Sequence, residues 1–268
     1  MAISFNTSFS NTNSVAGSNS TNDSFQKLSS GSKINSAKDD AAGLAIAEKL
    51  TSRLGGFDVA IRNANDSISA IQVADGALKS LNDNISRIQE LTLQAGNGAL
   101  NNQDRKALQA EADQLIDESN RLLENTNFNG KSLLNNAEGL SVQLDEPGKS
   151  IQLEGKNLAK DFQELGFDKV DLTSQSAANK SLETLSKASE LVISRQSELG
   201  AVSNRVENSI ENISSSRINA AEARSRISDA DFAKVAADLA ASQVRDQAQI
   251  AVQAQANGQR SAVLQLLS

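Results

Sequence analysis

Residues 185–227 read LSKASELVISRQSELGAVSNRVENSIENISSSRINAAEARSRI, and a small or large apolar residue returns at every seventh position. The series is Leu185, Val192, Leu199, Val206, Ile213, Ala220 and Ile227. A strict seven-residue repeat keeps one side of a helix turned toward partner helices and produces left-handed supercoiling. The repeat predicts a helix over about residues 176–228. Its large apolar members form what we call the assembly seam: Leu185, Val192, Leu199, Val206, Ile213 and Ile227.

The companion positions, three residues before the seam, are mostly polar, as at Ser189, Gln196 and Ser203. A seam that is only half apolar suits packing shared among several subunits better than a very stable, isolated coiled-coil dimer. A helix of roughly 50 residues also far exceeds the ~11–12 residues of an average globular-protein helix. We therefore expect other long helices to lie beside it.

Two further periodic segments precede this helix. The first covers about residues 58–95, and its apolar residues recur at steps of three and four, which form one stripe on a helix. This stripe is Ile61, Ala64, Ile68, Ile71, Ala74, Leu78, Leu81, Ile85 and Ile88. Glycines at 96 and 98 end the segment. Asn101 or Asn102 can cap a second helix. The stripe of that helix is Leu108, Ala112, Leu115, Ser119 and Leu122.

The middle of the chain predicts a β-hairpin. Apolar residues alternate with polar ones at Leu140, Val142 and Leu144, and again at Ile151 and Leu153. The intervening Asp-Glu-Pro-Gly-Lys contains the chain's single proline, so proline interrupts none of the expected helices. The loop-rich residues 158–172, with two phenylalanines, are expected to cover the hairpin.

Composition excludes several classes of function. The 268 residues include no His, Cys, Trp or Tyr, and the net charge is -7. Catalysis that depends on His or Cys, and zinc sites built from these ligands, are therefore excluded. An acidic chain without a Lys/Arg run is a poor nucleic-acid binder. No apolar run approaches the ~18 residues that a membrane span needs, and the amino terminus lacks the pattern of a secretory signal.

Both ends of the sequence are nearly free of charge. Residues 1–22 carry no charged side chain, and residues 247–268 carry only Arg260. For residues 1–22, a disordered leader and a weak amphipathic helix that orders on assembly both remain open. Since solvated tails are usually charged, two such ends indicate segments that pack against something.

Acidic pairs are the only candidates for acid–base chemistry. Asp39 and Asp40 are adjacent, and adjacent residues on a helix point about 100° apart, so these two do not face a common substrate. Asp229 and Asp231 form the other pair. We interpret both pairs as solvated or inter-subunit polar contacts, and we expect no enzyme activity, cofactor or metal.

Residues 28–43, LSSGSKINSAKDDAAG, closely resemble the N-terminal signature of bacterial flagellins. Matching motifs follow in the family's order. They are RNANDSIS at 62–69, IQELTLQA at 88–95, NFNGKSLL at 127–134, LGAVSNR at 199–205, ARSRISDADF at 223–232, AQAN at 254–257 and VLQLL at 263–267. Because the hairpin region continues directly into the last long helix, the chain resembles a minimal flagellin without variable outer domains.

The resemblance implies a mainly α fold: a long antiparallel helical bundle or coiled coil with a small β-hairpin region, whose terminal helices pair on assembly. It also implies four segments. Residues 1–40 and 229–268 are N- and C-terminal helices of the inner tube. Residues 41–175 hold the N-terminal core helices and hairpin, and residues 176–228 form the C-terminal core helix.

By the same resemblance, the chain is an extracellular subunit that polymerises into the flagellar filament for swimming, after unfolded export by the flagellar type III apparatus. The implied partners are copies of itself, an export chaperone, and the cap and hook-junction proteins. A vertebrate Toll-like receptor is a further implied partner, and Arg87, Glu90, Leu91 and Glu111 match its contact surface.

Two alternatives stay open at this point. A hook–filament junction protein shares parts of the terminal motifs, but such proteins match less well in the core. A secreted hydrolase or glycan-binding module on a helical scaffold is the third hypothesis, and the lack of His, Cys and a credible carboxylate site argues against it.

Overall fold

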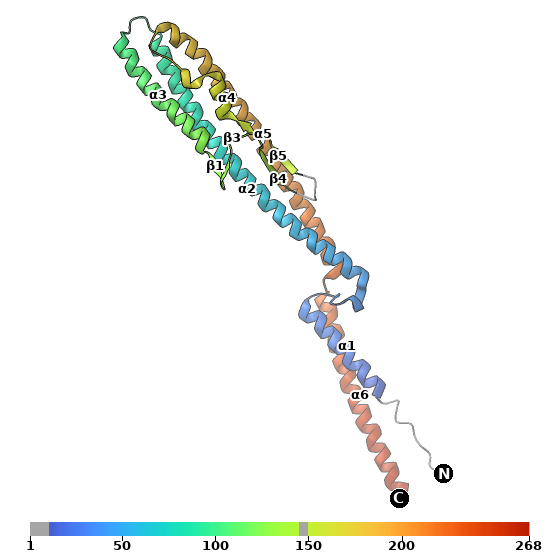
Figure 1. Ribbon diagram of the computed structural model, residues 1–268. Coiled ribbons are helices and arrows are strands. Elements are labelled where there is room, and N and C mark those ends of the chain that lie inside the picture. Colours follow the sequence, from blue (N-terminus) through green and yellow to red (C-terminus); the bar gives the residue numbers. More distant parts are fainter. Residues whose placement is uncertain (1–10, 145–149, 268) are drawn as a thin grey trace. The chain divides into compact units, whose positions relative to one another are not determined.

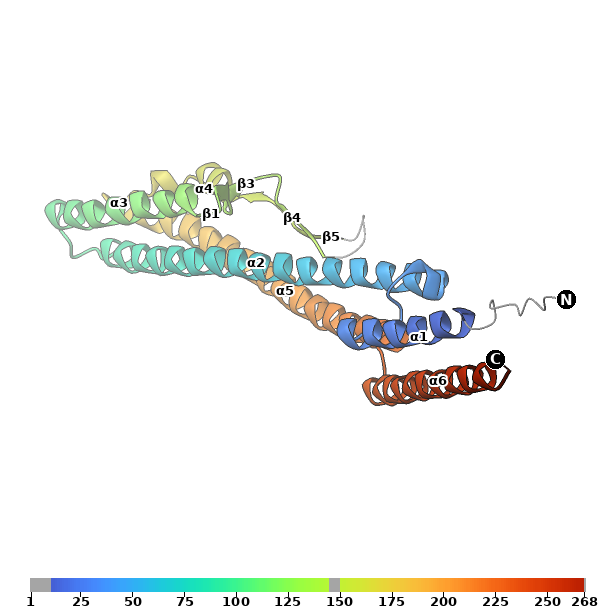
Figure 2. The same cartoon turned by 90° about the horizontal axis from the view of Figure 1, so that it is seen from below.

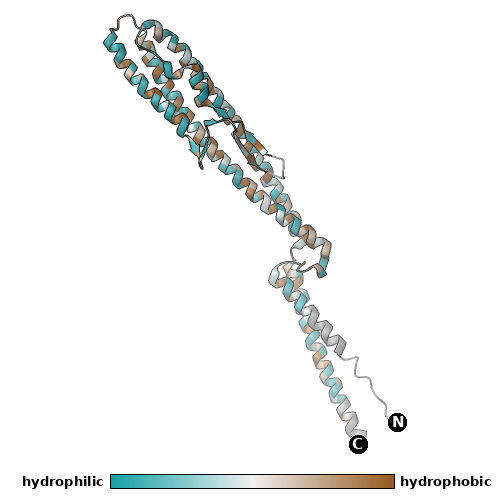
Figure 3. Cartoon of the chain, in the orientation of Figure 1, coloured by the Kyte–Doolittle hydropathy of each residue, from teal (hydrophilic) through white to brown (hydrophobic). Residues whose placement is uncertain are grey.

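The computed structural model describes residues 11–144 and 150–267, and long helices dominate it (Figure 1). The helices are α1 Asn11–Ser30, α2 Ala37–Ala95, α3 Asn102–Asn125, α4 Leu158–Leu165, η2 Phe167–Lys169 (a 3-10 turn), α5 Gln175–Ser228 and α6 Phe232–Leu267. The predicted mainly α fold with a small hairpin region is confirmed. Hydrophobic and hydrophilic residues alternate along α2 and α5 in Figure 3, as expected for helices with one buried side.

Three short antiparallel strand pairs lie between α3 and α5. They are β1 Asn127–Phe128 with β2 Lys131–Ser132, β3 Asn135–Asn136 with β6 Lys156–Asn157, and β4 Leu140–Gln143 with β5 Ser150–Leu153. The β4–β5 pair is the predicted hairpin, with Val142 opposite Ile151. Val142, Leu144 and Ile151 are buried, so the expected apolar face exists. The predicted turn, 145–149, lies outside the described residues.

The chain divides into two compact units. One combines the residues up to Leu54 with those from Ile218 onward, and the other spans Gly55–Arg217. Because α2 and α5 are long, each contributes a segment to both units.

The core of the unit Gly55–Arg217 forms where α2, α3, α4 and α5 meet. α3 lies beside α2 in both views (Figures 1 and 2). The fully buried large side chains are Phe162, Phe167, Leu78, Leu81, Ile85, Ile88, Leu91, Leu123, Leu134, Leu158, Leu172 and Leu185. Burial of one such side chain stabilises the fold by roughly 1.5–3 kcal/mol. The rings of Phe162 and Phe167 meet edge to face with centroids 5.0 Å apart.

The predicted stripe on α2 is buried except at Ile61 and Ile68, which are half-buried. On α3 the prediction is confirmed at Ala112 and Ser119 and is wrong at the three leucines. Ala112, Ile116, Ser119 and Leu123 are buried, whereas the predicted Leu108, Leu115 and Leu122 are half-buried. α3 also contacts α4, and Leu108 and Leu115 still pack against the edge of the core.

The turn between α2 and α3 follows the sequence signals closely. α2 ends at Ala95, and Asn101 caps α3 by accepting hydrogen bonds from the N–H groups of Gln103 and Asp104. The buried guanidinium of Arg105 donates to the carbonyl oxygens of Ala95, Asn97 and Leu100. These bonds satisfy backbone groups that a helix end leaves unpaired.

In the other unit, α1 packs along α6 within a single chain. Thr21 Oγ1 donates a hydrogen bond to Asp246 Oδ2, and the two atoms are 2.9 Å apart. Residues 11–22 of the expected amino-terminal segment belong to α1, and the rest of that segment lies outside the described residues. Asp40 interrupts the start of α2 with φ -163 and ψ 100, so regular helix begins after it.

Candidate subunit-contact surfaces

Large apolar side chains are exposed on every long helix except α3. They are Phe25, Ile46, Val59, Val73, Leu93, Ile193, Ile218, Phe232, Val244, Ile250 and Val252. Scattered exposed apolar residues are normal on soluble proteins. Among the described side chains, α2 and α6 hold four each, and α6 differs because it carries no charged residue from Gln247 to Gln259. That stretch can be buried without desolvation of an ion.

Five residues of the assembly seam are buried within one chain. Leu185, Val192, Leu199 and Val206 are at most 1% exposed, and Ile213 is 7% exposed. The sixth seam residue, Ile227, is half-buried. A substitution in this seam therefore acts first on the folding of the monomer. Contact of the seam with a second copy stays a prediction.

Arg87, Glu90 and Glu111, three of the four residues matching the receptor surface, form an exposed ion-pair cluster. Arg87 Nη2 lies 2.7 Å from Glu111 Oε1 and so joins α2 to α3, while Arg87 Nη1 lies 3.0 Å from Glu90 Oε2. Hydrogen bonding to Glu111, and then to Glu90, raises the pKa of Arg87. Leu91 is different, since only 1% of it is exposed. The isolated chain thus presents the charged cluster but buries Leu91.

The acidic pairs cap helices. Asp39 Oδ2 accepts hydrogen bonds from the N–H groups of Asn35 and Ser36, and these bonds lower the pKa of Asp39. Asp40 Oδ1 accepts from the Gly43 N–H at the start of regular α2. Both carboxylates therefore accept hydrogen bonds from backbone N–H groups, so neither is placed for acid–base chemistry.

At the second acidic pair, Asp231 Oδ1 accepts from the N–H groups of Ala233 and Lys234 in the first turn of α6. Asp229 pairs through its backbone with Ser32. The sequence interpretation missed these capping roles. The signal was present, since an Asp directly before a helical pattern, as Asp231 stands before Phe232, is a typical cap.

Sequence reasoning also missed Arg195, a buried cation on α5. It donates to Glu198 Oε2 over 3.0 Å and to the Glu154 carbonyl oxygen over 2.8 Å. Glu198 also accepts from Lys156 Nζ at 2.9 Å. Arg195 follows Val192 by three residues and precedes Leu199 by four, so its position on the seam side was readable from spacing.

Two kinds of site are absent from the described ranges, 11–144 and 150–267. No group of three or more acidic side chains there could hold a metal ion. No helix within those ranges is both long enough and apolar enough to cross a bilayer.

Comparisons with known proteins agree with this architecture. Residues 3–138 match the family model for the bacterial flagellin N-terminal helical region, and residues 182–267 match that for the bacterial flagellin C-terminal helical region. The chain is 38% identical over 245 residues to a flagellin of Halalkalibacterium halodurans, with 90% of each chain covered.

Two solved structures are similar. The Bacillus cereus flagellin crystal structure has a TM-score of 0.52 at 26% identity and covers 57% of this chain and 88% of that one. A structure ascribed to a flagellar hook-associated protein of Vibrio parahaemolyticus has a TM-score of 0.60 and covers 71% of this chain and 100% of that one. At 16% identity, the second likeness shows the fold alone. The two family models and the near-full-length relative show that the chain belongs to the bacterial flagellin family.

Proposed function

We propose that this protein is the structural subunit of an extracellular flagellar filament, formed by polymerisation of identical copies. The observation that supports this most strongly is the match to flagellin family models at both ends of the chain. The 38% identity to a flagellin over 90% of its length favours the filament subunit over a hook–filament junction protein.

The surface of α6 supplies the physical basis for assembly. Val244, Ile250 and Val252 are 65%, 71% and 67% exposed, and the last two lie in the stretch 247–259, which carries no charged residue. These three side chains do not share one side of a helix at 100° per residue. A helix that is apolar on several sides gains stability when it is surrounded. Identical contacts that repeat without closing then produce an open helical polymer.

We assign four segments to this polymer. Residues 1–40 and 229–268 would form the inner tube, 41–175 the N-terminal core helices with the hairpin region, and 176–228 the C-terminal core helix. The assembly seam would hold this last helix against the rest of its own subunit and, at Ile227, would reach a neighbouring copy. Half-burial of Ile227 in one chain is compatible with that contact.

Export and accessory partners belong to the same proposal. The subunit would leave the cell unfolded through the flagellar type III apparatus, with a chaperone, and would meet the cap and hook-junction proteins at the filament ends. Nearly uncharged terminal segments fit passage along a tube of similar helices, since they offer few ion-pairing groups to its wall.

A vertebrate Toll-like receptor is a further proposed partner. The exposed cluster Arg87, Glu90 and Glu111 offers both signs of charge on adjoining helices. Leu91 is buried behind this cluster, so it would support the surface from within rather than contact a partner directly.

Electron microscopy of the purified full-length chain tests the proposed function. After assembly is induced with salt, a filament subunit forms long tubes on its own, whereas a hook–filament junction protein does not. Failure of the chain to form tubes under conditions where a known flagellin assembles would favour the junction protein.

A further inference from the structure

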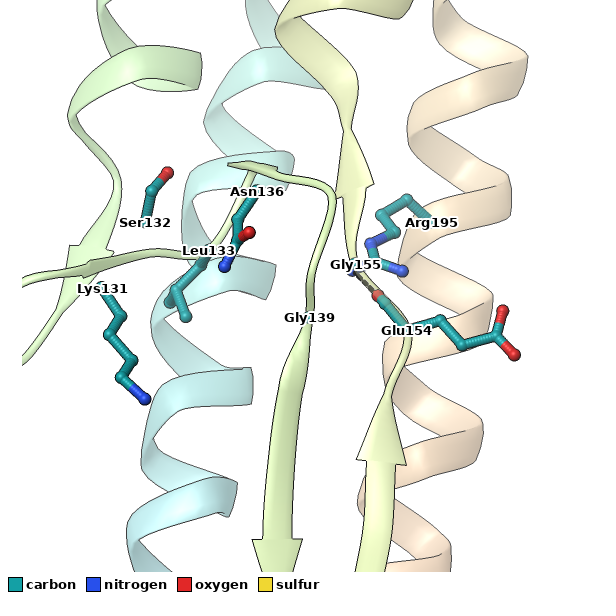
Figure 4. Close-up of a pocket in the computed structure, with 8 residues that line it drawn as sticks. All are labelled: Lys131, Ser132, Leu133, Asn136, Gly139, Glu154, Gly155 and Arg195. Atoms are coloured by element: carbon teal, nitrogen blue, oxygen red, sulfur yellow. Dashed lines mark hydrogen bonds between the residues drawn. The ribbon is translucent and has the colours of Figure 1, made fainter.

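A small cavity lies at the base of the β4–β5 hairpin, beside α5 (Figure 4). Its volume is about 10 Å³. Its walls include Ser132, Asn136, Gly139, Gly155 and Arg195. Gly155 fits only because it lacks a side chain, since a Cβ at this position would collide with the backbone of Ala137 and Gly139. Backbone therefore forms the wall of the cavity at Gly155.

Arg195 leaves one donor unused at this cavity. Its side chain is only 3% exposed, and its Nη1 and Nη2 atoms bind Glu198 and the Glu154 carbonyl oxygen. Among the described residues, no group accepts a hydrogen bond from the buried Arg195 Nε. An arginine has no acceptor atom of its own, and a buried N–H without an acceptor is destabilising. The site therefore needs a hydrogen-bond acceptor next to the Nε–H of Arg195.

The surrounding charges do not supply that acceptor. Within residues 11–144 and 150–267, Glu198 is the carboxylate that binds Arg195, and it already accepts from Lys156 as well. Glu154 contributes its backbone oxygen to Arg195, while the residue as a whole is exposed. Lys131, also on the cavity wall, is a donor and is exposed. The neighbouring ionised groups therefore leave the Nε–H of Arg195 unmatched.

We propose that the cavity is a binding site for one structural water molecule, which accepts a hydrogen bond from Arg195 Nε. A volume near 10 Å³ matches the ~10–15 Å³ that a single water needs and is too small for a phosphate or a carboxylic acid. A bound water also needs two to four polar partners. Ser132 and Asn136 bring further polar groups to the wall.

The water would complete a clamp between the hairpin region and α5. Arg195 already ties α5 to the chain between β5 and β6 through Glu154, and Lys156 ties β6 to the same helix through Glu198. With its Nε–H satisfied, Arg195 holds the start of β6 in place. The nearby bond from Leu158 N–H to the Leu134 carbonyl oxygen, 2.9 Å long, reports on that region.

Nuclear magnetic resonance on the labelled full-length monomer tests the proposal. We expect a cross-relaxation peak between the Arg195 Nε–H and a long-lived water molecule. Absence of that peak would overturn the proposal. A shift of the Nε–H signal on titration with bromide, at constant ionic strength, would also overturn it, because it would identify the occupant as an anion.

A matched pair of variants tests the clamp. Arg195→Lys keeps the charge but removes the Nε–H, whereas Arg205→Lys makes the same change at an exposed position of α5. We expect the first variant to lose the water peak and to speed hydrogen exchange at Leu158 at least tenfold, because it changes the donors to Glu198 and to the Glu154 carbonyl oxygen together with the Nε–H. Arg205→Lys should leave both unchanged. Equal exchange rates at Leu158 in both variants would contradict the clamp. If Arg195→Lys fails to fold, the presence or absence of the water peak in the wild type alone tests whether the cavity binds water.

Discussion

The hydroxyl group of Ser32 lies 2.8 Å from the carbonyl oxygen of Ser228, so the segment between α1 and α2 is bonded directly to the end of α5. The same carbonyl oxygen accepts a hydrogen bond from the Lys33 N–H over 2.7 Å. Residues nearly two hundred positions apart thereby meet in one backbone pairing. This pairing lies within the unit that contains both terminal helices.

Replacement of Ser32 by alanine is expected to loosen this pairing. One lost hydrogen bond costs about 1 kcal/mol, which corresponds to roughly fivefold faster exchange of the Lys33 N–H. Hydrogen exchange with mass spectrometry or magnetic resonance measures the change. Ser29→Ala, at an exposed position of α1, is the control and should leave the Lys33 N–H unchanged. Equal exchange in the two variants would show that the hydroxyl contributes nothing there.

Asp39 should make stability depend on acidity. Its pKa is lowered by the hydrogen bond from the Asn35 N–H and then by that from the Ser36 N–H. A carboxyl group whose folded-state pKa is depressed contributes stability above its unfolded pKa of about 3.9. That contribution is lost as the pH falls through the lower, folded-state pKa. Thermal unfolding of the monomer against pH should therefore show a smaller acid-dependent loss in Asp39→Asn than in the wild type.

The matched control for this titration is Asp66→Asn, an exposed carboxylate on α2. Identical pH profiles for Asp39→Asn and Asp66→Asn would show that the cap at Asp39 does not affect stability.

Substitutions in the assembly seam should prevent folding as well as assembly. Leu199→Asp places an unpaired charge at a position that is 1% exposed, and Ile213→Asp does so at a position that is 7% exposed. Even the milder Leu199→Ala should cost about 2–5 kcal/mol. Circular dichroism should show lost helicity in both aspartate variants, and electron microscopy should show no filaments. Asn204→Asp, exposed on the same helix, should behave as the wild type, and wild-type filaments from both seam variants would refute the seam assignment.

Receptor recognition should depend on the charged cluster, and substitutions in this cluster should not destabilise the fold. Arg87 is half exposed, and exposed ion pairs contribute little to stability, so Arg87→Ala should fold normally. In a receptor reporter-cell assay, we expect it to respond less than the wild type and less than Lys79→Ala, an exposed change elsewhere on α2. An undiminished response would remove Arg87 from the contact. Leu91→Ala cannot replace this test, because it opens the core.

Local sequence signals predicted α3, α5, the end of α2 and the hairpin because these features depend on nearby residues. They placed the start of this core helix near residue 58, whereas α2 begins at Ala37, and they predicted a loop-rich segment where α4 lies. The seven-residue repeat located the buried side of α5, and Asn101 was recognised as a cap before α3. The alternation around Val142 and Ile151 predicted one buried face of the hairpin.

Features that depend on distant segments escaped the same reasoning. Arg195 is buried because Glu154, forty-one positions earlier, offers a carbonyl oxygen to it. Gly155 is required by the close approach of the backbone near Gly139, which no local pattern reveals. The pairing of β3 with β6 likewise joins strands on either side of the hairpin. These contacts join segments that are distant in sequence, so they become visible only once the fold is known.

Assembly through the surface of α6 is the central claim, and electron microscopy of the full-length chain after salt-induced assembly tests it most directly. The account predicts long tubular filaments from the wild type. It predicts none from Ile250→Asp, whose monomer should keep the wild-type circular dichroism because this side chain is 71% exposed. A wild-type chain that remains a compact monomer at high concentration, or Ile250→Asp filaments as long as those of the wild type, would contradict it.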